Sequence, residues 1–277
     1  MPTPQLSRAA LAVVTLVLGC DRPAATSAAP TTPSTAAPTD ASSEPAALPE
    51  VALDHPGCFE IVALDGPAGA EPRRHEASAG ECAVPTIPAS TFKIPHALVA
   101  LQTGVVADPD AMVKWDGAKY WLKSWERDHS LRTAIEESVV WFFQRTAEQI
   151  GRERMREQLA KLDYGDAEVD GDIREFWLAG GSLEITCDEQ LDFVVRMFRD
   201  ELAIDATHVA IVQSIMKSDL ARWQPRVPKD FTVPASTATV WAKTGTDAVD
   251  GKRITWWMGA IEGPKGRFAF VSRVRDE

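Results

Sequence analysis

The sequence predicts a mixed α/β fold of the α+β type, because strand-like and helix-like patterns occupy different parts of the chain. Polar residues alternate with β-branched or aromatic residues in 236–242, whereas apolar residues recur at helical spacing in 131–137 and 209–216. The expected strands are 58–64, 237–243, 254–262 and 267–274. The expected helices are 92–103, 131–148, 150–162 and 187–201.

Two of these elements carry the clearest patterns. Segment 236–242 alternates as an edge or half-buried strand does, so Lys243 and Gly245 should share one face and Thr244 the other. Segment 131–137 has helical periodicity and leads into a large apolar block. A further stretch, 209–216, is typical of an ordinary amphipathic helix.

The chain is expected to begin with an export signal and a tether. Residues 1–20 hold one arginine and an apolar run that is too short to span a bilayer but suits a secretory signal. The run ends in Leu-Val-Leu-Gly-Cys, which resembles a bacterial lipobox with Cys20 as the lipidated residue; a plain signal peptide is the alternative. Residues 21–51 are rich in Ala, Thr, Pro and Ser, as linkers are, which leaves 52–277 as one domain. We therefore expect an exported, periplasmic protein whose contact with a membrane is a lipid anchor.

Charge and cysteine usage narrow the classes of partner. A formal net charge of −11 without a basic stripe argues against nucleic acid. The five histidines are scattered and no Cys or His group has zinc-ligand spacing, so we expect neither a metal nor an organic cofactor. Cys58 and Cys82 flank a short polar segment that a disulfide could close in an oxidising compartment, with Cys187 buried and unpaired. The sequence does not specify an oligomeric state.

Ser90 and Lys93 form a candidate nucleophile and base. Their spacing places both side chains on one face of a helical turn, and apolar neighbours would lower the lysine pKa until the amine can accept the serine proton. The alternative is a helix N-cap serine beside a solvated lysine. The same spacing recurs at Ser214 and Lys217, which we expect on a helix surface.

Three further motifs follow in order. They are Ser138 before an apolar block, Tyr164-Gly165-Asp166 leading to Trp177, and the triplet Lys243-Thr244-Gly245. Alone, each also suits a buried helix, a core tryptophan or a strand end. In this order and combination with Ser90 and Lys93, they resemble the class D (oxacillinase-type) serine β-lactamases over residues 56–274. Trp115-Asp116-Gly117 and Trp257-Met258-Gly259 add to the resemblance.

The resemblance implies both architecture and chemistry. The architecture is an antiparallel sheet flanked by helices, with a helical subdomain inserted between its edge strands. Ser90 would attack the β-lactam carbonyl, and Lys93, carrying a carboxyl group derived from carbon dioxide, would act as general base. Trp177 would hydrogen-bond this N6-carboxylysine. Ser138 would pass a proton to the leaving nitrogen.

The resemblance also implies a substrate site. Lys243 and Thr244 would hold the substrate carboxylate, and the backbone N–H groups of Ser90 and Thr246 would form the oxyanion hole. Gly245 would let the substrate approach the backbone, and Val140 is counted with these substrate-binding residues.

Two departures from the family pattern stand out. Asp166 occupies a position where asparagine is usual, which would add a carboxylate near the site. The family continues past this chain's last residue with a substrate-binding arginine and a C-terminal helix; Arg273 and Arg275 come too early to match that arginine. We expect a truncated sequence, and the alternative is that the N-terminal segment covers the same sheet face.

Three functions therefore compete. The first is hydrolysis of the β-lactam ring through a serine acyl-enzyme. The second is a penicillin-sensing or penicillin-binding domain that acylates without efficient turnover. The third is an envelope lipoprotein that cannot be acylated. The sequence does not reveal which β-lactams would be preferred.

Overall fold

The computed structural model describes residues 57–219 and 238–275. The expected signal (1–20), linker (21–51) and lipidation residue Cys20 lie outside the described residues. The described strands form one six-stranded antiparallel sheet in the order β2-β1-β6-β5-β4-β3. Their bounds are Gly57–Ala63 (β1), Arg73–Glu76 (β2), Lys217–Asp219 (β3), Thr239–Val249 (β4), Lys252–Gly263 (β5) and Gly266–Arg275 (β6).

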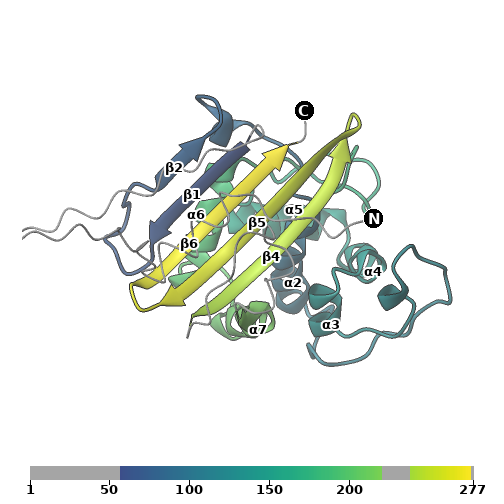
Figure 1. Cartoon of the computed structure of the whole chain (residues 1–277). Helices are drawn as coiled ribbons and strands as arrows, with labels where there is room; N and C mark the ends of the chain where they lie inside the picture. Colours follow the sequence, from purple (N-terminus) through teal and green to yellow (C-terminus); the bar gives the residue numbers. More distant parts are fainter. Residues whose placement is uncertain (1–56, 220–237, 276–277) are drawn as a thin grey trace, which may run out of the picture.

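All the described helices lie in sequence between the edge strands β2 and β3, so the expected inserted helical region is confirmed. The α-helices are Lys93–Gln102 (α2), Leu131–Glu136 (α3), Val140–Ile150 (α4), Arg152–Leu162 (α5), Cys187–Phe198 (α6) and Ala206–Met216 (α7). Short 3₁₀ helices span Glu81–Ala83 (η1), Ala89–Phe92 (η2) and Lys123–Trp125 (η3). Helix α6 packs on β1, β5 and β6, while α3 and α4 lie beyond β4 (Figure 1). None of the helices described is long and apolar enough to cross a bilayer.

The expected continuous helix over 131–148 is wrong, because the chain turns at Ser138. Ser138 has a left-handed backbone (φ 57°), which an α-helix does not accommodate. The amide of Val139 donates to Ala134 O, and the indole of Trp125 donates to Glu137 O at 2.9 Å. These bonds hold a turn between α3 and α4, and the turn presents Ser138 rather than burying it in a helix.

Strand β4 continues six residues beyond the predicted end at Lys243. It pairs with β5 up to Val249, where Asp250 and Gly251 form the hairpin turn with φ values of 52° and 76°. Asp-Gly suits a two-residue hairpin turn because both positions need positive φ. The longer strand carries the chain past the triplet that contains Lys243, so residues after Gly245 also belong to the sheet.

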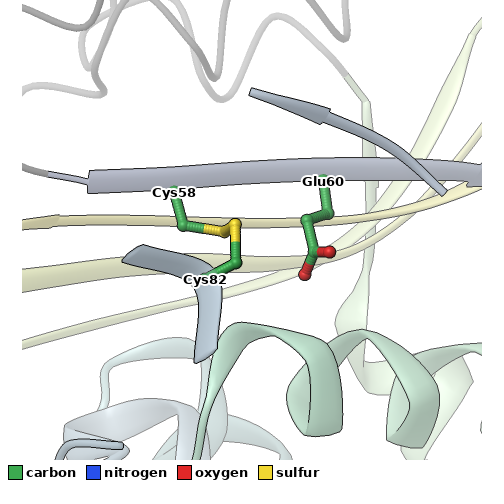
Figure 2. Close-up of side chains that lie close together, drawn as sticks. All are labelled: Cys58, Glu60 and Cys82. Atoms are coloured by element: carbon green, nitrogen blue, oxygen red, sulfur yellow. A yellow bond between two sulfur atoms is a disulfide. The ribbon is translucent and has the colours of Figure 1, made fainter. Parts of the chain in front are cut away.

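A disulfide joins Cys58 on β1 to Cys82 on η1, and Glu60 projects from β1 on the same side (Figure 2). The three side chains are close enough to suggest a metal site, but the disulfide uses both sulfurs. Cys187 is a buried free thiol.

Glu60 itself is fully buried, and its Oε1 accepts a bond from Arg74 Nε at 2.9 Å. Burial, reinforced by the neighbouring Asp188, raises the pKa of Glu60 from 4.5 to about 8.

This pKa predicts a pH-dependent stability. A carboxyl whose folded pKa is raised binds its proton more tightly in the native state, so its contribution is present below pH 4.5 and is lost as the pH rises through 8. Glu60→Gln cannot ionise, so its unfolding free energy should gain about 1–3 kcal/mol relative to the wild type between pH 5 and pH 9. Urea unfolding of both proteins at each pH measures the gain. The exposed Glu262→Gln serves as control, and an equal pH response in all three proteins would contradict the prediction.

Candidate active site

Ser90 and Lys93 meet where η2 runs into α2. Lys93 Nζ donates a hydrogen bond to Ser90 Oγ at 2.7 Å, and the Lys93 side chain is completely buried. The alternative of a solvated lysine is therefore wrong. The second pair behaves as expected of surface residues, because Ser214 is exposed and bonds Ile211 O, and Lys217 is exposed at the start of β3.

The turn that carries Ser90 is strained and held from several sides. Ala89, immediately before the serine, has φ 48°, an unfavourable value for a residue with a Cβ. The indole of Trp256 on β5 donates to Ile87 O at 3.0 Å. Gly245 of β4 lies against the turn so closely that a Cβ there would stand 3.0 Å from Ser90 N. Any larger residue at 245 would therefore push β4 away from the nucleophile.

The surroundings of Lys93 favour its neutral form. Burial lowers the pKa of Lys93 from 10.5 to about 7, and the negative charge of Asp247 partly opposes this effect. Its Nζ lies 5.6 Å from the centre of the Phe143 ring. An ordinary lysine is almost fully protonated at neutral pH, whereas about half of a population with pKa 7 carries a free lone pair. Lys93 can thus accept a proton from Ser90.

Trp177 is buried near Ser90 and Lys93, and its indole N–H forms no hydrogen bond within the described part of the chain. The ring stacks on Phe92, with centroids 5.5 Å apart, and meets the ring of His96 edge-on at 5.7 Å. Its Nε1 has no hydrogen-bond partner among the residues described. Because most buried N–H groups are satisfied, an unpaired indole N–H here indicates a place for an acceptor.

His96 belongs to the same cluster and was not identified from the sequence. It is buried, and burial together with Lys93 lowers its pKa to about 3, so the ring is neutral. Its Nε2 lies 3.1 Å from Thr146 Oγ1. The spacing from Lys93 to His96 is three residues, which places them on one helix face and could have revealed it.

Ser138 and Lys243 form a second pair, contributed by segments far apart in the chain. Lys243 Nζ donates to Ser138 Oγ at 3.1 Å and to Thr244 O at 2.7 Å. Lys243 and Gly245 share the sheet face that looks towards the helices, as predicted, and Thr244 lies on the other. The left-handed backbone of Ser138 is a second strained position at the site.

The remaining predicted residues are placed as follows. Val140 is half-buried at the start of α4, and Thr246 is exposed on β4 directly after Gly245. Tyr164 is buried against Phe92 and Phe193, and Gly165 has φ 55°.

The Asp166 carboxylate binds backbone amides of its own loop and of the segment after Trp177. Its Oδ1 accepts bonds from the amides of Glu168 (3.1 Å) and Glu184 (3.2 Å), so the carboxylate fastens its own loop. Arg273 and Arg275 both form ion pairs with Glu81, at 2.9 and 2.8 Å. Neither arginine takes part in the cluster around Ser90. This agrees with the sequence analysis, which did not assign either of them as the substrate-binding arginine.

Asp247 is a further residue that the sequence did not single out. Its Oδ2 accepts a bond from Ala179 N at 3.0 Å, which ties β4 to the loop that follows Trp177. The missed signal was the length of β4: once the strand is known to continue, Asp247 shares a face with Lys243 and Gly245.

Comparisons with known proteins identify the family. Residues 60–277 match the family described as the penicillin binding protein transpeptidase domain. The chain is 36% identical over 176 residues to β-lactamase OXA-48 of Klebsiella pneumoniae, covering 64% of this chain and 61% of that protein. It is 35% identical over 189 residues to the probable β-lactamase YbxI of Bacillus subtilis, covering 68% and 65%. The match thus spans less than two thirds of these curated relatives.

Solved structures extend the match. A class D β-lactamase from Bacillus subtilis is 32% identical, with a TM-score of 0.67 over 80% of this chain and 85% of that chain. The class D β-lactamase YbXI from Nostoc is 30% identical, with a TM-score of 0.68 over 80% and 84%. Fold, site geometry and sequence therefore lead to the same conclusion: the chain belongs to the class D β-lactamase family of the penicillin-binding-protein fold.

Proposed function

We propose that this chain hydrolyses the β-lactam ring of penicillin-type antibiotics through an acyl-enzyme on Ser90. The observation that carries the proposal is the 2.7 Å contact between Lys93 Nζ and Ser90 Oγ, in surroundings that lower the pKa of Lys93 to about 7. A serine becomes nucleophilic only when a neighbouring base can take its proton. A buried, half-neutral amine at hydrogen-bond distance meets that condition.

The other residues supply the remaining steps. Ser90 Oγ bonds to the carbonyl carbon and gives its proton to the base at Lys93. The bond from that carbon to the ring nitrogen breaks, and the nitrogen takes a proton through Ser138 Oγ, to which Lys243 Nζ donates at 3.1 Å. The N–H groups of Ser90 and Thr246 stabilise the negative oxygen, while Lys243, on the same sheet face as Gly245, attracts the substrate carboxylate. Water then cleaves the ester and restores Ser90.

We also propose that Lys93 carries a carboxyl group derived from carbon dioxide. The neutral amine forms an N–C bond to carbon dioxide and releases one proton, so a pKa near 7 suits the reaction. The unpaired Trp177 Nε1 would donate to the new carboxylate, and the apolar rings of Phe92 and Phe143 would limit competing water. When present, this group supplies the general base. The residues around Lys93 therefore fit it.

Nitrocefin turnover, measured with and without added bicarbonate, tests this function. We expect hydrolysis that bicarbonate stimulates, because the modified lysine is in equilibrium with dissolved carbon dioxide. A stoichiometric adduct on the intact protein, detected by mass spectrometry without turnover, would instead support the penicillin-sensing alternative. A folded sample that neither turns over nor becomes acylated would refute both functions.

The two Ser-x-x-Lys motifs provide a matched pair of variants. Ser90→Ala should reduce nitrocefin turnover on the order of 10⁴-fold or more and abolish the acyl adduct, because the nucleophile is gone. Ser214→Ala should retain wild-type turnover, since Ser214 is exposed and its hydroxyl donates to Ile211 O of its own helix. Equal losses in the two variants would overturn the choice of nucleophile.

We propose in addition that the protein is exported and anchored by a lipid on Cys20. The sequence of residues 1–20 supports this, as does the Cys58–Cys82 disulfide, because disulfides persist mainly outside the reducing cytosol.

A further inference from the structure

The Asp247 carboxylate lies along β4 on the side of the nucleophile opposite to Lys243. Lys243, Gly245 and Asp247 are alternate residues of one strand, so their side-chain positions share a face and follow each other at roughly 7 Å. The middle position, Gly245, is the one that lies against the Ser90 turn. A cation and an anion therefore flank the nucleophile along a single strand.

The Asp247 carboxylate is held by hydrogen bonds, and its negative charge acts on the Lys93 amine. Its Oδ2 accepts from Ala179 N at 3.0 Å and its Oδ1 from Ala248 N at 2.9 Å. It forms no ion pair with any residue in the described ranges 57–219 and 238–275, and it is half-buried. Its negative charge opposes the fall in the pKa of the buried Lys93, so its field reaches the amine beside Ser90. A substrate bound at Ser90 would experience the same field.

A β-lactam presents two different ends to this strand. Its ring carboxylate and its acylamino side chain leave the bicycle on opposite sides of the reactive carbonyl. With the carboxylate on Lys243 and the carbonyl at Ser90, the acylamino side chain extends towards Asp247. An ammonium on that side chain would be attracted there, and a carboxylate would be repelled.

We propose that Asp247 is a specificity-determining residue, which favours β-lactams with a cationic acylamino side chain over those with an anionic one. The proposal rests on the proposed β-lactam hydrolysis. It adds a charge preference that neither the family match nor the motifs around Ser90 supply.

The test compares three penicillins that differ in the charge of the side chain: ampicillin (cationic), benzylpenicillin (neutral) and carbenicillin (anionic). In Asp247→Asn, the ratio of kcat/KM for ampicillin to that for carbenicillin should fall about three- to tenfold, since partly exposed charge pairs contribute modestly. The asparagine keeps an oxygen for Ala179 N. Any effect of the lost charge on Lys93 is common to the three penicillins and therefore cancels in the ratio. The wild-type ratio should also fall in high salt, which screens the charge.

Two further variants separate charge from loop position. Asp250→Asn changes an exposed carboxylate in the hairpin turn and should leave the ratio unchanged. Asp247→Ala also removes the bond to Ala179 N and should lower kcat/KM for all three penicillins, benzylpenicillin included. An unchanged ratio in Asp247→Asn, with benzylpenicillin still hydrolysed, would overturn the inference alone. If the protein is acylated without turnover, acylation rates for the three penicillins give the same ratio; absence of any acylation would remove both the function and the inference.

Discussion

Replacement of Lys93 by methionine is expected to abolish nitrocefin turnover and to make the protein more stable. Methionine fills nearly the same volume but offers no base at the position where Nζ lies 2.7 Å from Ser90 Oγ. Loss of the base from a nucleophile–base pair commonly costs on the order of 10⁴-fold or more in kcat. We expect no acyl adduct on the time scale of wild-type turnover.

The gain in stability follows from the pKa of the buried amine. Burial lowers the pKa of Lys93 from 10.5 to about 7, so protonation is less favourable in the folded chain than in the unfolded chain. The wild type therefore loses stability as the pH falls from 10.5 to 7, and the full penalty applies below pH 7. Lys93→Met has no such penalty. Its unfolding free energy should exceed that of the wild type by on the order of a few kcal/mol at pH 6 and by less at pH 9.

Urea unfolding at pH 6 and pH 9, with nitrocefin kinetics on the same samples, measures both effects. Lys217→Met is the matched control, because Lys217 closes the second Ser-x-x-Lys motif but is exposed. It should change neither turnover nor the pH dependence of stability. Turnover by Lys93→Met near the wild-type rate would show that the base lies elsewhere.

The residues that sequence analysis identified best are those whose chemistry depends on short spacing. Ser90 and Lys93 are three residues apart, and the start of a helix is enough to bring them together. What the spacing could not decide was which of two identical motifs is buried. That depends on contacts with distant segments, such as Gly245 against the Ser90 turn. The choice of Ser90 and Lys93 came instead from the order of Ser138, Trp177 and Lys243 along the chain. That order resembles a known family, whereas no local pattern distinguishes the two motifs.

The features that escaped prediction depend on backbone torsion and on long-range burial. Helical periodicity continues through Ser138 because a single left-handed residue does not disturb the pattern of apolar residues. The buried ionisable side chains of Glu60 and His96 acquire their pKa values from neighbours that only the fold brings close. Asp247 was missed because β4 was expected to end at Lys243. The strand in fact continues to Val249 and therefore includes Asp247.

Trp177→Phe is expected to make turnover depend strongly on bicarbonate. Phenylalanine retains an aromatic ring to pack on Phe92 and His96 but lacks the indole N–H, which is buried and unpaired among the described residues. If that N–H donates to a carboxylate on Lys93, its loss should weaken the modification. Removal of such a supporting hydrogen bond typically costs 10–100-fold, so we expect about that loss of kcat in carbon dioxide-depleted buffer.

Bicarbonate at millimolar concentrations should restore a large part of this loss, because mass action refills a weakened site. An acyl adduct should accumulate in the depleted buffer, since the general base is also needed to release the product. The measurement is kcat for nitrocefin as a function of bicarbonate for the variant and the wild type, with mass spectrometry of the protein during turnover. The half-saturating bicarbonate concentration should rise by the same factor by which the modification is weakened.

Trp256→Phe separates this role from a merely structural one. Trp256 is also fully buried, but its indole N–H is already used by Ile87 O at 3.0 Å. Its replacement should lower the melting temperature and disturb the Ser90 turn, so any loss of turnover should not respond to bicarbonate. If Trp177→Phe behaves in the same way, with turnover lost and no recovery at any bicarbonate concentration, the unpaired N–H is a packing feature. The proposed carboxyl group on Lys93 would then lack its principal support, although Ser90 and Lys93 could still act as nucleophile and amine base.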